Sequence, residues 1–209
     1  MSIKELLFTK KERQVSYYDA SNQMAALQFA GEFSRLVEEL CLEKNKNGLL
    51  FLCIGSDRST GDSLGPLIGY KLKERQDPDI VVVGTLDEPV HAINLEDHLS
   101  AVRQVYKDYL VVAVDASVGS MENVGFITLG KGSLKPGLGV SKNLCAVGDM
   151  FITGIVSGLG TCDPLMLQST RLSMVMRLAD CISDGICLGI SKKPNIFKQL
   201  DKKKRFDRA

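Results

Sequence analysis

The sequence has no Cys-x-x-Cys pair and no His-x-His pair, although six cysteines are spread along the chain. Structural zinc sites and the disulfide frameworks of small secreted domains depend on such regular spacings. The six are Cys41, Cys53, Cys145, Cys162, Cys181 and Cys187, and several of them lie inside apolar segments, as free thiols do in a reducing compartment. The pattern disfavours a zinc or disulfide framework and indicates a cytoplasmic protein.

Long apolar runs and a strong net charge are also missing. No uninterrupted apolar stretch approaches the roughly 20 residues that a membrane helix needs, and charged residues interrupt the N-terminus before a signal-peptide core could form. The formal net charge is +1, so the whole chain has no bias towards nucleic acid or membranes. Residues 192–209 alone carry eight Lys and Arg against two Asp. We interpret them as a solvated basic tail and expect neither nucleic acid nor a membrane as a partner.

The sequence does contain a series of short runs that are apolar without alternation. Three of them predict strands covered on both faces, as in the centre of a parallel sheet: residues 49–54, 80–83 and 110–114. The segments between them carry apolar side chains at helical spacing, and so does 22–44. A strand at 125–129 and helices at about 149–159 and 164–184 complete the prediction. This order predicts an α/β fold, a three-layer αβα sandwich with a mostly parallel central sheet.

The predicted boundaries divide the chain into one domain and two ends. Residues 21–191 form the single α/β domain, residues 1–20 an N-terminal extension and residues 192–209 the basic tail. Ser21 is predicted to cap the helix at 22–44, and Asn94 is predicted to cap the helix that begins directly after Asn94. Their side chains can accept hydrogen bonds from the free backbone N–H groups at a helix start.

Acidic residues follow the ends of the predicted strands, where open parallel sheets bind their ligands. Asp115 comes directly after the strand at 110–114, and Asp62 closes the loop after the first strand. The same loops supply the candidate substrate-binding residues Gly55, Ser56, Asp87 and Glu88.

The loop from Gly55 to Asp62 resembles a phosphate-binding loop only in its glycines. A P-loop has Lys after its second glycine, whereas Asp62 follows Gly61 here, and a carboxylate repels phosphate. We therefore expect no nucleotide. Two neighbouring carboxylates can instead divide the roles of acid and base, or supply hard ligands to a metal. Each could also have a structural role, Asp62 as a helix N-cap and Asp115 as the cap of a turn.

The segment 135–142 combines a proline with two glycines, which predicts a tight loop with exposed backbone N–H groups. Gly137 and Gly139 could hold an oxyanion or a peptide backbone there, and Lys142 could add positive charge. The alternative is an ordinary surface connection. His91 and His98 are interpreted as surface or packing residues.

Three ordered motifs resemble those of the germination protease of spore-forming bacteria. The segment 51–66 resembles its opening motif, with Asp62 ahead of an apolar-Gly-Pro step, and 112–116 resembles the strand of its second catalytic Asp. Residues 136–142 resemble its Pro-Gly-x-Gly-Val loop, and 148–151 the start of the helix after it. The whole chain resembles the sporulation proteins of the YyaC type, which are related to that protease.

The wider superfamily includes the hydrogenase-maturation endopeptidases, and the resemblance implies their phosphorylase/hydrolase-like sandwich. In them, acids at the places of Asp62 and Asp115 and a later His hold a nickel ion. No His stands near 147–149, where that His would align, so the resemblance does not extend to nickel recognition.

The resemblance to the germination protease implies an aspartic-type endopeptidase without a metal or cofactor, in which Asp62 and Asp115 are catalytic. Its partner would be a protein or peptide substrate, in the cytoplasm of the mother cell or forespore. A metal-dependent hydrolase would need a third ligand, for which Asp149, Asp57 or His91 are the candidates. The alternative from another class is a non-catalytic binding or regulatory protein on the same scaffold, and a homo-oligomer stays open.

Overall fold

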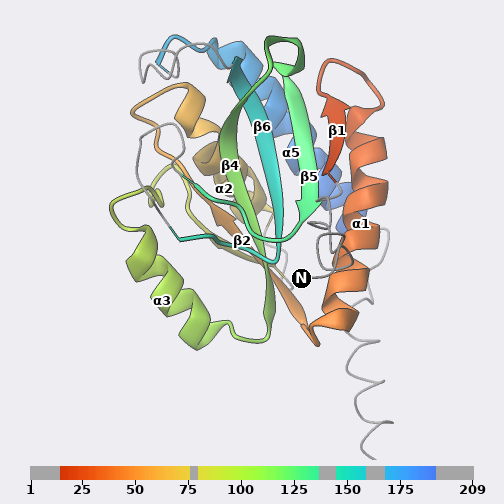
Figure 1. Ribbon diagram of the computed structural model, residues 1–209, viewed down its shortest axis with the longest axis vertical. Coiled ribbons are helices and arrows are strands. Elements are labelled where there is room, and N and C mark those ends of the chain that lie inside the picture. Colours follow the sequence, from red (N-terminus) through yellow and green to blue (C-terminus); the bar gives the residue numbers. More distant parts are fainter. Residues whose placement is uncertain (1–14, 76–79, 137–144, 159–167, 192–209) are drawn as a thin grey trace, which may run out of the picture.

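Six strands form one sheet in the described part of the computed structural model, which covers residues 15–75, 80–136, 145–158 and 168–191. Their order across the sheet is β1-β5-β6-β4-β2-β3 (Figure 1). The strands are β1 (Val15–Asp19), β2 (Gly48–Cys53), β3 (Ile80–Val83), β4 (Tyr109–Gly119), β5 (Phe126–Lys131) and β6 (Met150–Gly158). β3, β2, β4 and β6 pair in parallel, while β5 pairs antiparallel with both β6 and β1. The predicted α/β fold with a mostly parallel sheet is confirmed.

Helices cover both faces of the sheet (Figure 1). One core cluster joins the sheet to α1 (Ala25–Glu43), α2 (Leu64–Glu74) and α5 (Leu172–Ser191), and a second joins its other face to α3 (Leu95–Val105). Two short 3-10 helices, η2 (Gly61–Ser63) and η3 (Met121–Asn123), follow β2 and β4. No helix in the described ranges is long and apolar enough to cross a membrane. The layers are those of the predicted αβα sandwich.

The two core clusters explain why the central strands are apolar without alternation. Every residue of β2 is buried. Phe51 and Cys53 pack in the cluster of α1, α2 and α5, whereas Leu50 and Leu52 pack in the cluster of α3. Because both faces are removed from water, apolar side chains are favoured at every position of the strand.

The helix predicted at 149–159 is wrong, because this segment is β6. All nine of its residues are buried. A short segment that is apolar on every side has neither the period of a helix nor that of a half-buried strand, so its pattern does not distinguish the two. Its β-branched residues favour a strand, and they make up much of its length: Ile152, Thr153, Ile155 and Val156. The last helix is confirmed as α5, although its predicted start at Asp163 and Pro164 lies outside the described residues.

The prediction that residues 1–20 lie outside the core is wrong for their last part. β1 pairs with β5 along its whole length and forms one edge of the sheet, so the domain includes Val15. Ser21 does not cap α1, which begins at Ala25. Its backbone N–H and its hydroxyl both donate to Asp19 Oδ1, at 2.9 Å and 2.7 Å, and close the turn after β1 instead. Residues 1–14 and the tail at 192–209 are outside the described ranges.

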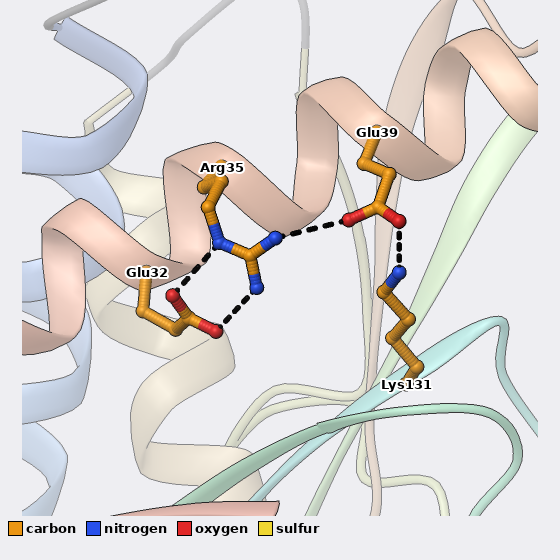
Figure 2. A network of polar contacts seen from close by, with 4 residues as sticks. All are labelled: Glu32, Arg35, Glu39 and Lys131. Atoms are coloured by element: carbon orange, nitrogen blue, oxygen red, sulfur yellow. Dashed lines mark hydrogen bonds and ion pairs between the residues drawn. The ribbon is translucent and has the colours of Figure 1, made fainter. Parts of the chain in front are cut away.

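A network of charged side chains joins α1 to β5 on the surface (Figure 2). Arg35 donates to Glu32 at 2.6 Å and to Glu39 at 3.1 Å, both on the same helix. Lys131, the last residue of β5, pairs with Glu39. Exposed ion pairs add little stability, so the position of α1 is set by its buried face and not by this network.

α2 lies very close to the ends of β2 and β3 because glycines line the contact. A methyl group on Gly65 would overlap the backbone carbonyl of Ile54, and one on Gly69 would overlap the carbonyl oxygen of Gly84. Gly84 has a φ of +93° and fits in turn against the carbonyl oxygen of Cys53. This contact holds the start of α2, and η2 before it, over the carboxyl ends of the strands.

Replacing Gly69 by alanine should destabilise the protein by at least about 2 kcal/mol, because the added methyl group must push α2 away from Gly84. Gly31 is the matched control, since it lies inside α1 and nothing is within 4 Å of a methyl group there. Alanine at position 31 should stabilise the protein by about 0.5–1 kcal/mol through its higher helix propensity. Urea unfolding measures both effects, and stabilisation by alanine at both positions would contradict the close contact.

Candidate active site

β4 continues beyond the end of β2, and Asp115 lies at the point where the two strands part. β2 pairs with β4 as far as Cys53 opposite Val114, and the N–H of Ile54 donates to the carbonyl of Val114 at 2.7 Å. β4 then runs on to Gly119, paired with β6 alone. The expectation that Asp115 follows its strand is therefore corrected: it lies within β4, which is extended by pairing with the unpredicted strand β6.

Asp62 is held beside the end of β2 by the loop that precedes η2. The chain leaves β2 at Gly55, whose φ is +140° and where a methyl group would overlap the carbonyl oxygen of Asp62. The N–H of Ser56 donates to that carbonyl at 3.2 Å. Neither Thr60 nor Ser63, the N-cap residues of η2 and α2, makes a side-chain cap, and Asp62 lies inside η2. The interpretation of Asp62 as a simple helix N-cap is thus not supported.

The two carboxyl groups are close enough to interact electrostatically, and their pKa values are raised to different extents. Asp115 is 7% exposed. Burial raises its pKa well above the ordinary value, the negative charge of Asp62 raises it further, and the N–H of Ala116, which donates to Asp115 Oδ1 at 2.8 Å, opposes the shift. Burial also raises the pKa of Asp62, against the backbone N–H of Ser56 and the charge of His91. Asp115 is therefore the member that retains a proton, and Asp62 the one that ionises first.

His91 belongs to this site, although the sequence favoured a surface or packing residue and named His91 otherwise only as a candidate third metal ligand. It lies in the loop after β3, near enough to Asp62 to lower the pKa of that carboxyl. Its Nδ1 accepts the N–H of Ile93 at 3.4 Å, and its own N–H donates to Asn94 Oδ1 at 2.8 Å. Asn94 stands at the N-cap of α3 as predicted, but its side chain holds this loop and does not cap the helix. The only signal in the sequence was the position of His91 after a strand.

A row of hydroxyl groups crosses β4, β6 and β5 on the same side of β4 as Asp115. Thr153 of β6 lies 2.9 Å from the hydroxyl of Ser117 and 2.7 Å from that of Thr128. Side chains two residues apart on a strand share a face, which places Ser117 next to Asp115. These residues could not be found from the sequence, because β6 was assigned as a helix.

The other predicted site residues are more distant or not described. Asp87 and Glu88 are exposed in the loop after β3, where the N–H of Glu88 donates to Thr85 Oγ1 at 3.2 Å. No hydrogen bond or ion pair within the described ranges joins either of them to Asp62 or Asp115. Three predicted residues of the proline-glycine loop lie outside the described residues: Gly137, Gly139 and Lys142.

Comparison with known proteins places the sequence in a family. Residues 17–185 match the family described as "Protein of unknown function (DUF1256)". The chain belongs to this family. It is 41% identical over 188 residues to the "Uncharacterized protein YyaC" of Bacillus subtilis (strain 168), an alignment that covers 90% of each chain. The matched region of the DUF1256 family includes Asp62, His91 and Asp115.

A solved structure also shows similarity, at a lower level. It is the NiFe hydrogenase maturation protease HycI from Thermococcus kodakarensis KOD1, with 20% sequence identity and a TM-score of 0.44. The match covers 73% of this chain and 99% of that one.

The described residues of this DUF1256 member contain no group of three His, Cys, Asp or Glu side chains arranged to hold a metal ion. Of the candidates for a third ligand, Asp149 has a structural role elsewhere in the sheet. Its carboxylate accepts the N–H of Val111 at 2.9 Å and pairs with Lys44. Asp57 is exposed, and His91 interacts with Asp62.

The raised pKa of Asp115 predicts how stability depends on pH. In the folded protein Asp115 keeps its proton up to a higher pH than it does in the unfolded chain, where its pKa is about 4. The free energy of unfolding should therefore decrease as pH rises from about 4 to the raised pKa of the folded state. Asp115→Asn does not titrate and should lose most of this decrease. Asp97→Asn, an exposed residue of α3, should keep it. Urea unfolding across this pH range provides the measurement, and parallel curves for the wild type and Asp115→Asn would show that Asp115 is not perturbed.

Proposed function

We propose that this protein is an endopeptidase of the aspartic type, in which Asp62 and Asp115 activate water against a peptide bond. The observation that carries the proposal is the coupling of two partly or fully buried carboxyl groups whose environments separate their pKa values. Such a separation keeps one carboxyl protonated as an acid while the other is ionised and acts as a base.

The separation of the pKa values assigns the roles. Ionised Asp62 would accept a proton from water as the water oxygen bonds to the peptide carbonyl carbon. Protonated Asp115 would donate its proton to the carbonyl oxygen, which becomes a hydroxyl of the tetrahedral intermediate. When the intermediate collapses, the C–N bond breaks, the nitrogen takes the proton held by Asp62, and the hydroxyl proton returns to Asp115. The pair therefore ends the cycle in its starting state.

The cellular role and the substrate rest on the motif resemblance described above. The segments around Asp62 and Asp115 resemble the catalytic motifs of the germination protease, so the proposed substrate is a spore protein. The proposed place of action is the cytoplasm of the mother cell or forespore. Sheet geometry is consistent with a catalytic site, because both acids lie at the carboxyl end of parallel strands.

A second candidate is a non-catalytic binding or regulatory protein on the same scaffold. The low exposure of Asp115, 7%, favours it, because a catalytic carboxyl must reach both water and substrate. Under this alternative the protonated Asp115 is a structural residue of β4, satisfied by the N–H of Ala116.

Cleavage of small acid-soluble spore proteins, read by intact mass, distinguishes the two candidates. The wild type should cleave, and Asp62→Asn and Asp115→Asn should each lose at least about a hundredfold in rate, the usual contribution of a positioned acid or base. Asp97→Asn is the matched control, since Asp97 is an exposed acid of α3 outside the candidate site. It should retain wild-type activity.

Each result has a clear meaning provided that circular dichroism shows every variant to be folded. Loss of cleavage in both site variants but not in Asp97→Asn supports the carboxyl pair. No cleavage by the folded wild type rejects the peptidase and favours the binding protein.

A further inference from the structure

The segment of β4 beyond Val114 has a free edge within the described structure. On one side this segment pairs with β6 as far as Gly119 opposite Gly158. On the other side the pairing with β2 ends at Val114, because the chain turns away at Gly55, whose N–H donates to the carbonyl of Val90 at 2.7 Å. No described strand takes the place of β2 beside residues 116–119.

Strand geometry identifies the backbone groups that point to this edge. In a parallel sheet, the N–H and C=O of one residue point to one neighbour and those of the next residue point to the other. Val111 points to the β6 side, where its carbonyl accepts the N–H of Asp149, and Val114 points to the β2 side, where its carbonyl accepts the N–H of Ile54. The register with β6 shifts between Ser117 and Val118, but the extra residue there, Val156, lies in β6 and not in β4. The alternation along β4 therefore continues, and Ala116 and Val118 face the side that β2 has left.

Three of the four backbone groups on this edge face a position that no strand occupies in the described part of the chain. The N–H of Ala116 donates to Asp115 Oδ1. The carbonyl of Ala116 and both the N–H and carbonyl of Val118 face the side on which no described strand pairs with β4 beyond Val114. Val118 itself is 39% exposed.

No side chain on this edge protects it from pairing with another strand. Proteins commonly place charged residues or proline on such an edge. Residues 116–119 are Ala, Ser, Val and Gly, all uncharged. Because consecutive strand residues are about 3.3 Å apart, Val118 lies roughly 10 Å along the strand from Asp115. An occupant of the edge would reach the carboxyl pair.

We propose that an extended peptide pairs with the edge of β4 at residues 116–119 and occupies the sheet position that β2 leaves at Gly55. That the peptide is the substrate rests on the proposed function, whereas the pairing of a peptide with this edge does not. Main-chain hydrogen bonds to Ala116 and Val118 supply the affinity and tolerate many sequences. They align the peptide backbone so that it runs past Asp115 and Asp62.

The charges around this end of the sheet favour a peptide with basic side chains. Three of the four exposed charged residues in the loops after β2 and β3 are acidic: Asp57, Asp87 and Glu88, against Arg58. An acidic surface attracts basic partners over a Debye length of about 8 Å at physiological salt. The expected ligand is thus an unstructured, basic segment of polypeptide.

Binding is measured separately from cleavage in the full chain carrying Asp62→Asn, which blocks the proposed hydrolysis. Fluorescence anisotropy records the binding of labelled pools of ten-residue peptides, one rich in Lys and one rich in Glu. Val118→Pro removes the N–H on the edge and no bond to β6, and proline is tolerated on free edges. Val118→Thr is the control, because it keeps the N–H and the β-branched shape.

The Lys-rich pool should bind more tightly than the Glu-rich pool. Val118→Pro should weaken that binding about three- to tenfold, the effect of losing one net hydrogen bond, while Val118→Thr changes it less than about twofold. This result supports the edge even if the wild type cleaves nothing, in which case only the proposed function fails.

Three results would overturn the proposal. The first is equal binding to the proline and threonine variants, and the second is no binding of either pool by a folded protein. The third is concentration-dependent dimerisation in sedimentation that Val118→Pro abolishes without any peptide binding, because the occupant would then be a second copy of the chain. Cleavage of the spore protein by the wild type, together with any of these results, would leave the peptidase intact and reject the edge as its substrate site.

Discussion

The close contact between α2 and the strand ends is the constraint on which the candidate site depends. Gly65 and Gly69 let the helix backbone approach the backbone of Ile54 and Gly84, and Gly55 lets the strand end approach Asp62. Side chains at these positions would force the helix outward. Asp62 would then move away from the end of β2, where β4 carries Asp115. The electrostatic coupling of the two acids is therefore a consequence of backbone packing.

This arrangement places a group in the core that would be more stable if neutral. An ionised carboxyl at the position of Asp115 loses most of its hydration and faces the charge of Asp62. A single hydrogen bond from Ala116 compensates only in part. Retaining two acids at this position is a cost to folding, and perturbed groups of this kind cluster at functional sites. Structural networks also perturb pKa values, which is why the peptidase and the binding protein must be separated by experiment.

The sequence predicted the fold class correctly, because strands that are buried on both faces appear in the sequence as short, unbroken apolar runs. Three central strands were located from their unbroken apolar runs, and α1 and α3 from their helical spacing. β6 was missed because a segment buried on every side carries no period, and β1 because a short edge strand beside a charged N-terminus resembles an extension. Asp62 and Asp115 could be proposed from their places after strands. His91 was proposed only as a third metal ligand, and the hydroxyl row was missed. Their neighbours come from loops and strands that only the folded chain brings together. The roles of Gly137, Gly139 and Lys142 stay predictions.

The most direct test of the account is a carbon-13 NMR titration of the aspartate carboxyl groups in the wild type and in Asp62→Asn. The account predicts that the signal of Asp115 titrates well above the ordinary aspartate pKa of about 4, and that its midpoint falls when the charge of Asp62 is removed. Titration of Asp115 near the ordinary value, or a midpoint that Asp62→Asn leaves unchanged, would contradict the coupling of the pair.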